Sequence, residues 1–331
     1  MDQSVLERLP TGARVCVIRL RSLGDCVLTT PAIALLKLAR PDLRVAVVVE
    51  DRFAAVFSGS PDVEQTLAPE AGEIVRWRPD LVLNLHGGNK SVQLTVASRA
   101  ALRAGFEHFR FQPLYNIRIP RAQKILGVDR KVHTAEHLAS AMFYLGVPVS
   151  EIPRARLFAD LPMGQAGSLR RVGNPPGAPN DNRRAAYQAA PQVRAYAVIH
   201  PTASAPDKTW PAERFMDVAR CMKDLDPVFI AGPGESLAAF SGYRTVVGAP
   251  LEDVKSLMAG AALFVGNDSG PAHIAAAFGV PVVVLFGSSD PDIWSPWTTQ
   301  AAVLACPNGI AGINTPQAIA AVSALLPQAV R

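Results

Sequence analysis

Residues 263–297 read LFVGNDSGPAHIAAAFGVPVVVLFGSSDPDIWSPW, and their pattern predicts a strand, a turn, a helix and a second strand. Residues 262–265 form a short apolar run that a glycine ends, as is typical of a buried strand. Residues 272–278 have a helical composition and also stop at a glycine, and residues 280–286 form the second apolar run. A strand, a helix and a strand in this order make one βαβ unit, which favours a parallel sheet.

The polar turn between the first strand and the helix contains Asp268, Ser269 and Gly270, followed by a proline suited to a first helical turn. In a parallel sheet this turn lies at the carboxyl edge, where helix amides and the helix dipole favour a phosphate group. We expect His273, near the helix start, to face the same crevice. Helix capping alone would also explain the turn, but a second glycine-rich turn at 287–291 favours a ligand site.

Length and composition indicate a globular protein. The 331 residues allow two domains of ordinary size, and hydrophobic residues make up 49% of the chain against 18% charged residues. No apolar run approaches the length of a membrane span, and the N-terminal residues lack the apolar centre of a signal peptide. The four cysteines show no CxxC spacing, as is typical of reduced thiols. We therefore expect a cytoplasmic protein.

The positive charge of the chain is concentrated in its first half. Lys and Arg exceed Asp and Glu by 21 − 16 = 5 up to residue 165 and by 12 − 12 = 0 after it; between His86 and Lys131 the counts are 9 and 2. A solvated basic face would explain this excess, and so would an acidic partner such as anionic lipid headgroups or an acidic glycan. No nucleic-acid-binding motif is present and aromatic residues make up only 7%, so we expect no nucleic acid partner.

The first half of the chain alternates predicted strands and helices. Strands are expected at 14–20, 45–49 and 81–85, and helices at 26–39, from the turn at 86–91 through Arg103, and at 133–145. Residues 103–106 are typical of the start of a short strand, residues 108–119 of a loop, and His137 is placed on the surface of its helix. No GxGxxG follows the first strand, which argues against a nicotinamide-dependent dehydrogenase.

Asp25 ends the turn that follows the first predicted strand, close to Arg19 and Arg21. One interpretation is an aspartate in a first helical turn, stabilised by the helix dipole. The other is a carboxylate at the carboxyl edge of the sheet that accepts a proton from a substrate. The position in the sequence leaves both interpretations open.

A Gly-, Pro-, Asn- and Ala-rich stretch at 166–192 is the predicted linker between two domains. After it, strands are expected at 196–200, 227–231 and 245–247, and helices at 210–225 and 251–259. The predicted architecture is α/β, with two doubly wound Rossmann-like domains at 1–165 and 193–313 whose polar turns face one cleft. A C-terminal helix within 314–331 could pack back on the first domain.

The chain contains, in this order, RLRSLGD at 19–25, LHGGNKS at 85–91, HPT at 200–202, DKTWP at 207–211, AGPGE at 231–235, GNDSGPAH at 266–273 and GSSDP at 287–291. These motifs resemble those of the bacterial heptosyltransferases of glycosyltransferase family 9, and they cover nearly the whole chain. The resemblance implies a GT-B fold and a reaction without a metal or another cofactor. It further implies that heptose moves, with inversion, from ADP-L-glycero-D-manno-heptose to the lipopolysaccharide inner core or to lipid A-Kdo.

The resemblance also implies roles for individual residues. Asp25 would be the catalytic base, and the donor nucleotide sugar would be bound by Thr202, Lys208, Glu235, Asp268, Ser269, Gly270 and His273. Turn position makes Arg19, Arg21 and Lys90 candidates for binding the acceptor, with Arg52 as a further candidate. A membrane-borne, acidic acceptor would suit the basic first half, with the protein in peripheral contact with the cytoplasmic face of the inner membrane.

Three other functions stay open at this stage. A relative could transfer another sugar from a nucleotide diphosphate to a surface glycan. A sugar-nucleotide binding protein without catalysis and a sugar-nucleotide epimerase would use the same fold. A carboxylate at the position of Asp25 favours a transferase, because a binding protein does not need one there.

Overall fold

The computed structural model describes residues 3–159 and 195–326, which contain two parallel six-stranded sheets. Strand order is β3-β2-β1-β4-β5-β6 in the first sheet and β12-β11-β10-β7-β8-β9 in the second. The strands of the first sheet are β1 (Arg14–Ile18), β2 (Arg44–Val48), β3 (Gln65–Leu67), β4 (Leu81–Asn84), β5 (Leu102–Phe106) and β6 (Ile117–Ile119). Those of the second are β7 (Tyr196–His200), β8 (Asp226–Ala231), β9 (Arg244–Val247), β10 (Leu263–Asn267), β11 (Val282–Phe286) and β12 (Ala301–Ala305).

Helices connect the strands, as parallel pairing requires. In the first half they are α1 (Leu23–Ala39), α2 (Asp51–Ala54), α3 (Ala71–Trp77), α4 (Asn89–Ala97), α5 (Ala122–Leu126) and α6 (Thr134–Leu145). In the second they are α7 (Ala212–Cys221), α8 (Leu251–Ala259), α9 (Gly270–Phe278), α10 (Pro291–Trp294) and α11 (Thr315–Leu325). Short 3₁₀ turns lie at η1 (Gln112–Leu114), η2 (Pro206–Lys208), η3 (Ala238–Phe240) and η4 (Ile310–Gly312).

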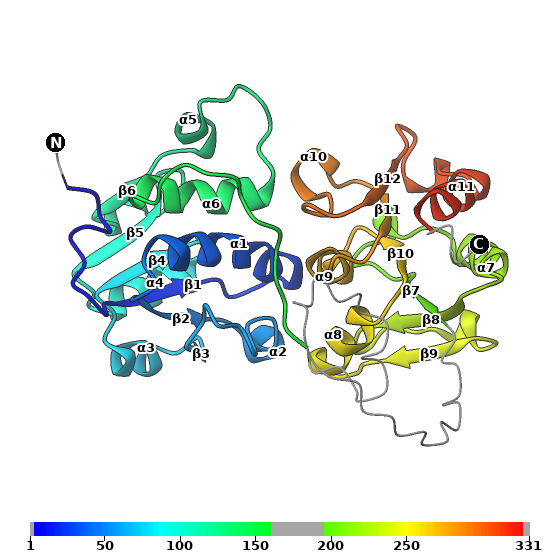
Figure 1. Ribbon diagram of the computed structural model, residues 1–331, viewed down its shortest axis with the longest axis horizontal. Helices are drawn as coiled ribbons and strands as arrows, with labels where there is room; N and C mark the ends of the chain where they lie inside the picture. The colour runs from blue at the N-terminus through cyan, green and yellow to red at the C-terminus, as the bar shows by residue number, and fades with distance from the viewer. Residues whose placement is uncertain (1–2, 160–194, 327–331) are drawn as a thin grey trace, which may run out of the picture.

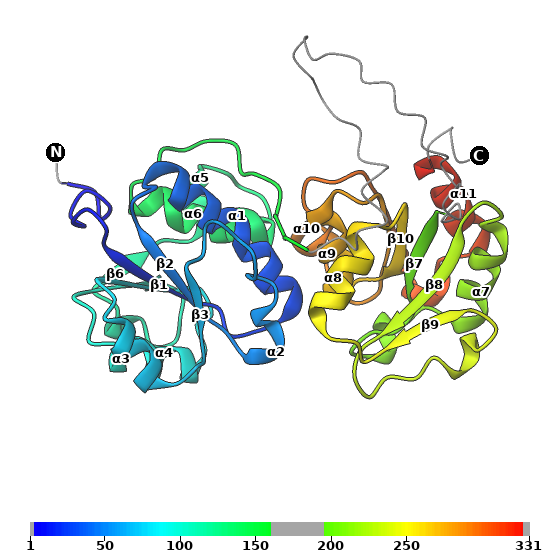
Figure 2. The ribbon, with the colours of Figure 1, turned by 60° about the horizontal axis from the view of Figure 1, so that its bottom comes forward.

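The sheets lie in two lobes placed side by side, with α1 and α2 of the first lobe facing α8 and α9 of the second (Figure 1). In the first lobe, α1, α5 and α6 cover one face of the sheet and α3 and α4 cover the other (Figure 2). The alternation of β1 explains this arrangement, because Val15 and Val17 join the apolar cluster under α1 and α6, whereas Cys16 and Ile18 join the cluster of α3 and α4. The predicted doubly wound α/β architecture is therefore confirmed.

Both sheets have their topological switch point at the first strand of the lobe, which is β1 in one sheet and β7 in the other. β1 pairs with β2 on one side and β4 on the other, and β7 pairs in the same way with β8 and β10. The chain therefore reverses its winding direction beside β1 and beside β7. Ligands of open parallel sheets bind outside the carboxyl ends of the strands at this point. Asp25 follows β1, and the turns after β7 and β10 contain Thr202, Lys208 and Asp268.

Several predicted elements differ from the structure. The helix expected to run through Arg103 ends at Ala97, and the segment 108–119, expected to be a loop, contains η1 and the edge strand β6. α11 packs on α7 and on β11 and β12, where Ala318 and Val322 join the apolar cluster of the second lobe; its expected packing on the first domain is wrong. The predicted linker at 166–192 lies outside the described residues.

Candidate functional site

A cavity of about 1020 Å³ lies between the carboxyl ends of the two sheets. The first lobe contributes the start of α1 and part of α2, and the second lobe contributes the turns after β7, β8, β9 and β10 and the first residues of α8 and α9. Eight of the residues predicted to form the site line it: Asp25, Arg52, Lys208, Glu235, Asp268, Ser269, Gly270 and His273. Its volume is in the range of cavities that hold cofactor-sized ligands.

Two glycines allow the lobes to meet beside the cavity. A Cβ atom on Gly24 of α1 would lie 2.7 Å from Cδ2 of His273 on α9, and one on Gly270 of α9 would lie 2.7 Å from Cδ2 of Leu23 on α1. These distances are far shorter than a carbon–carbon contact, so each first helical turn requires glycine where it meets the other. As a result, the N-termini of two helices open on one cavity.

Asp25 lies both in the first turn of α1 and at the wall of the cavity. It is the third residue of α1, where its Oδ2 accepts hydrogen bonds from the Ser22 backbone N–H at 3.4 Å and from the Ser22 hydroxyl at 3.1 Å. Its Oδ1 lies 3.4 Å from Nη1 of Arg19. Its side chain is 20% exposed and lines the cavity. The carboxylate is thus held in place from behind while it stays within reach of a ligand.

On the opposite wall, Asp268 and Lys208 form a polar pair. Nζ of Lys208, which ends η2, lies 3.9 Å from Oδ2 of Asp268, which follows β10. The Ser289 hydroxyl donates a hydrogen bond to the same carboxylate oxygen. Burial raises the pKa of Asp268, and the Ser289 hydrogen bond and the Lys208 charge oppose that rise. Gly287 lets the turn after β11, which contains Ser289, approach η2, because a Cβ on Gly287 would lie 2.1 Å from the Asp207 carbonyl oxygen.

Glu235 and Thr202 are linked to the start of α9 through a histidine that the sequence analysis did not select. The Thr202 hydroxyl and the Gly232 N–H each donate to Oε2 of Glu235 at 2.6 Å. Nε2 of His200 lies 3.1 Å from the Thr202 hydroxyl, and its Nδ1 lies 3.0 Å from the Ser269 hydroxyl. Thr202 does not line the cavity itself, but it holds Glu235, which does.

His273 is buried on α9 beneath the meeting point of the lobes, where only 4% of it is exposed. Its Nδ1 is buried without a hydrogen-bond partner. Burial lowers the pKa of His273 to about 4, with a further contribution from His133, while the Asp25 charge opposes the shift. The ring is therefore neutral near pH 7.

The three predicted acceptor residues lie in different surroundings. Arg19 is buried behind Asp25, and its Nε has no hydrogen-bond partner. Burial lowers the pKa of Arg19, against the opposing charge of Asp25. Arg21 is exposed next to the start of α1, and Lys90 is exposed on the first turn of α4; neither lines the cavity.

The surroundings of two histidines near Arg19, His86 and His137, could not be predicted from sequence spacing. Nδ1 of His86, after β4, is also buried without a partner. His137, expected on a helix surface, stacks on Phe106 with ring centroids 4.0 Å apart, and burial lowers its pKa to about 4. That expectation is wrong because the edge of the sheet, with β5 and β6, extends beneath α6. Two aromatic side chains that line the cavity, Phe53 from the first lobe and Trp294 from the second, were not predicted, since α2 and α10 are single turns without periodicity. Arg52 lines the cavity beside Phe53.

Among the described residues, polar contacts of Lys131, Lys255, His133 and Trp297 join the lobes around the cavity. Nζ of Lys131 lies 2.6 Å from Oδ2 of Asp290, and Nζ of Lys255, which is fully buried, donates to the Ala55 carbonyl at 2.6 Å. Nε2 of His133 lies 2.8 Å from the Ser295 carbonyl, and Nε1 of Trp297 donates to the Pro153 carbonyl at 3.1 Å. Because the Ala135 N–H donates to Nδ1 of His133, the ring proton is on Nε2 and faces Ser295.

Two features are absent from the described residues, 3–159 and 195–326. No group of three or more His, Cys, Asp and Glu side chains is arranged to hold a metal ion. No helix within these ranges has both the length and the apolar character needed to cross a membrane.

Comparison with known proteins gives a consistent result. The family model of glycosyltransferase family 9 (heptosyltransferase) matches residues 73–311. Over 301 residues the chain is 24% identical to lipopolysaccharide heptosyltransferase 3 of Escherichia coli K12, covering 83% of each protein. Over 305 residues it is 27% identical to lipopolysaccharide heptosyltransferase 1 of Pseudomonas aeruginosa, covering 84% of this chain and 79% of that one.

Solved structures share the fold. A family 9 glycosyltransferase of Veillonella parvula superposes with a TM-score of 0.77 at 22% identity, covering 95% of this chain and 97% of that chain. The E. coli heptosyltransferase WaaC with ADP gives 0.72 at 19% identity, covering 94% and 99%. The likeness to these structures confirms the GT-B arrangement of two Rossmann-like lobes. Since the family model spans most of the chain, this protein belongs to glycosyltransferase family 9, the heptosyltransferases.

Proposed function

We propose that the protein transfers heptose from ADP-L-glycero-D-manno-heptose to the lipopolysaccharide inner core, with inversion and without a metal, and that Asp25 is the general base. The observation that carries the proposal is the cavity between the lobes. It has a single fixed carboxylate on one wall, and Lys208, Asp268 and the start of α9 on the other. The relatives named above are heptosyltransferases of lipopolysaccharide, which supports the donor and the kind of acceptor.

The acceptor side of the reaction needs a base. As the acceptor hydroxyl attacks the anomeric carbon, its proton must leave, and a carboxylate within hydrogen-bond reach can take it. Ser22 donates a hydrogen bond to Oδ2 of Asp25, and Nη1 of Arg19 lies 3.4 Å from Oδ1, so both oxygens are held in position. Attack from the Asp25 wall while the diphosphate departs toward the opposite wall would invert the anomeric centre.

The donor side must stabilise negative charge on the departing diphosphate. The Lys208 ammonium and the N-terminus of α9 both face the cavity, and they supply a positive charge and a helix dipole. Ser269 and Gly270, at this N-terminus, line the cavity, which places the helix start within reach of a phosphate oxygen. The part of the cavity lined by Ile230, Leu251 and Val254 is apolar and suits the flat base of a nucleotide.

The acceptor would enter from the first lobe. Arg19 and His86 each have a buried nitrogen without a partner close to Asp25, which suits an acceptor with an anionic group beside its reacting hydroxyl. Arg21, Lys90 and Arg52 add positive charge nearer the surface. We propose that these residues, and not the donor wall, determine which acceptor is used.

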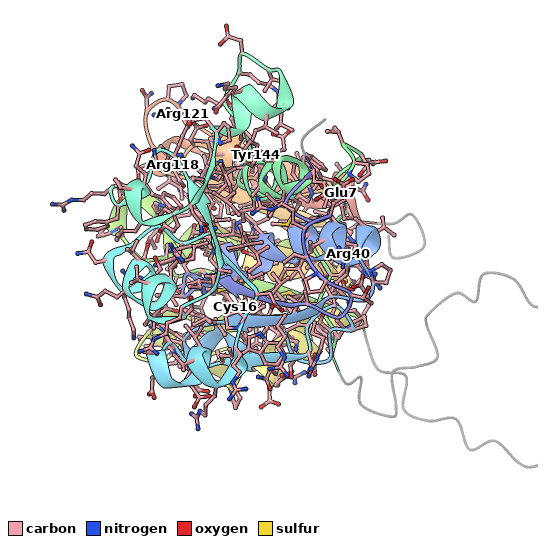
Figure 3. All side chains as sticks on the ribbon, turned by 90° about the vertical axis from the view of Figure 1, so that its left-hand side faces the viewer. Glu7, Cys16, Arg40, Arg118, Arg121 and Tyr144 are labelled. Carbon is pink, nitrogen blue, oxygen red and sulfur yellow. The ribbon has the colours of Figure 1, made fainter. Side chains whose placement is uncertain are left out.

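Peripheral contact with the cytoplasmic face of the inner membrane is part of the proposal. Arg110, Arg118, Arg121 and Lys124 are exposed on the first lobe, and none forms an ion pair with a described residue. Arg118 and Arg121 lie on its outer face (Figure 3). Unpaired basic side chains on one face are attracted to anionic headgroups, by about 1 kcal/mol each near the surface.

Product analysis tests the proposal. The purified protein is incubated with ADP-heptose and truncated lipid acceptors, and the products are identified by mass and anomeric configuration. We expect heptosylated lipid with the configuration inverted relative to the donor. A retained configuration, or transfer that stops when metal ions are chelated, would contradict the mechanism.

Nucleotide-dependent stabilisation separates the other functions. A ligand that binds only the folded state raises the midpoint of thermal unfolding. We expect ADP to raise it and UDP to leave it unchanged. Stabilisation by UDP alone would favour a relative that uses another nucleotide sugar, and stabilisation by ADP without turnover of any acceptor would favour a binding protein.

A further inference from the structure

His200 is a buried histidine that no proposed catalytic step uses, and it connects three of the turns that line the cavity. It is the last residue of β7 and is 6% exposed. One ring nitrogen contacts Thr202, in the turn after β7, and the other contacts Ser269, at the start of α9. Through Thr202 it also reaches Glu235, in the turn after β8.

The direction of these hydrogen bonds follows from the chemistry of the groups. A carboxylate only accepts, so the Thr202 hydroxyl donates its single hydrogen to Glu235. Its oxygen must then accept from His200, which places the ring proton on Nε2. Nδ1 is left with a lone pair, to which the Ser269 hydroxyl donates. The chain therefore runs from Ser269 through His200 and Thr202 to Glu235.

This assignment leaves Ser269 with one competing acceptor. Its oxygen also lies 3.0 Å from the Asn267 carbonyl, so its hydrogen is shared between that oxygen and Nδ1 of His200. Burial lowers the pKa of His200 to about 4, while the Glu235 carboxylate, whose oxygen lies 3.9 Å from Nε2, opposes the shift. The ring is therefore neutral near pH 7, as a directed chain with one ring proton requires.

We infer that His200 is a positioning residue of the donor site, whose neutral Nε2–H imidazole holds Thr202, Glu235 and Ser269 in register for the nucleotide sugar. The inference rests on the proposed donor site. His200 lines the cavity, but its two ring nitrogens are engaged by Thr202 and Ser269, so it acts through the residues it holds. Without it, the Thr202 and Ser269 hydroxyls would lose a buried partner, and the turns that present them would no longer share a fixed geometry.

Substitution of His200 provides the functional test. We expect His200→Ala to raise the Kd of ADP about ten-fold while kcat with saturating donor falls less than five-fold, because the lost contacts order the bound ground state. His200→Gln keeps an amide N–H near the position of Nε2, so it should restore the Kd to within about three-fold of the wild type.

A control separates positioning from general destabilisation. Phe240 stacks on Phe229 in the core of the same lobe, with ring centroids 4.3 Å apart, and it does not line the cavity. Phe240→Leu should lower the midpoint of thermal unfolding and leave the Kd of ADP unchanged. Equal losses of ADP affinity in His200→Ala and Phe240→Leu, or wild-type affinity in folded His200→Ala, would overturn the inference.

The tautomer can be measured without any nucleotide. In the free protein at pH 6, ¹⁵N NMR should show His200 as a neutral imidazole protonated at Nε2. A proton on Nδ1, or a doubly protonated ring, would overturn the inference even if ADP binds. Failure of the wild-type protein to bind ADP would instead contradict the proposed donor, while the tautomer would still test the role of His200.

Discussion

At the scale of single residues, the site depends on two charged groups, Asp25 and Lys208. Each has a polar partner in the protein and still lines the cavity. Asp25 is held by Ser22 on one oxygen and by Arg19 on the other, yet it still lines the cavity. Lys208 is 29% exposed and 3.9 Å from Asp268, a separation too long for a strong hydrogen bond. Both groups are thus oriented by the protein without being fully neutralised, which is what a base and a cation in a transferase need.

Lys208 offers the first prediction. Lys208→Ala removes the positive charge that would face the departing diphosphate, so donor binding and turnover should both suffer. We expect the Kd of ADP to rise about ten-fold and kcat to fall about a hundred-fold. Calorimetric titration with ADP and steady-state kinetics would measure the two effects.

The matched control for Lys208 is Arg220→Ala, which removes an exposed charge of the same lobe that pairs with Asp217 and does not line the cavity. Arg220→Ala should change neither the Kd of ADP nor kcat. A Lys208→Ala protein with wild-type kcat would remove Lys208 from the leaving-group site.

At the scale of elements, the meeting of α1 and α9 determines the geometry of the cavity. Gly24 and Gly270 each occupy the first turn of one helix and face a side chain of the other. Pro31 interrupts α1 further along, and the Thr30 hydroxyl donates to the Val27 carbonyl that a proline cannot bond. The start of α1 is thereby fixed while its middle tolerates a missing backbone bond.

Gly24→Ala and Gly270→Ala test this contact. Each adds a Cβ 2.7 Å from a side-chain atom across the interface, so the lobes must shift apart locally. We expect kcat/KM to fall at least ten-fold, because small displacements of reacting groups cost rate steeply, with each lobe still folded by circular dichroism.

The control for the two glycines is Gly72→Ala in α3, where a Cβ would meet no atom within 4 Å. This substitution should keep full activity and stabilise the protein slightly, by up to about 1 kcal/mol. Full activity in Gly24→Ala as well would show that close approach of the helices is not required.

Much of the second lobe could be predicted from sequence, because glycine-rich turns separate its apolar runs clearly. The unit of β10, α9 and β11 is where the pattern of residues 263–297 places it. The edge strand β6 could not be predicted: its three residues alternate Ile117 and Ile119 with an exposed arginine, too short a run to show a period. The burial of His137 and the links made by His200 could not be predicted for a related reason, since their partners come from distant segments that sequence spacing does not connect.

At the scale of the whole molecule, all six histidines have pKa values below the ordinary range, chiefly because of burial. Three of them, His137, His200 and His273, lie near 4. The unfolded chain takes up protons near pH 6.5, whereas the folded chain does so only near pH 4. Stability is therefore full above about pH 6.5 and falls as the pH drops toward 4.

The free energy of unfolding should therefore change measurably with pH. Each of the three histidines contributes at most about 1.4 kcal/mol per pH unit in that window. We expect the free energy of unfolding in urea to be several kcal/mol lower at pH 5 than at pH 7. His137→Leu keeps an apolar group beside Phe106 but cannot titrate, so it should reduce the difference by about a third. An unchanged difference would mean that His137 is not buried as described.

The proton acceptor is the central claim, and Asp25→Asn tests it most directly, because the amide keeps the shape of the side chain but cannot take a proton. Turnover of ADP-heptose with lipid acceptor is compared with the Kd of ADP in the wild type, in Asp25→Asn and in the exposed-carboxylate control Asp129→Asn. We predict that Asp25→Asn lowers kcat by 10² to 10⁴-fold, on the order expected for loss of a general base, while the Kd changes less than three-fold. Wild-type turnover in Asp25→Asn, or a loss matched by Asp129→Asn, would contradict the account.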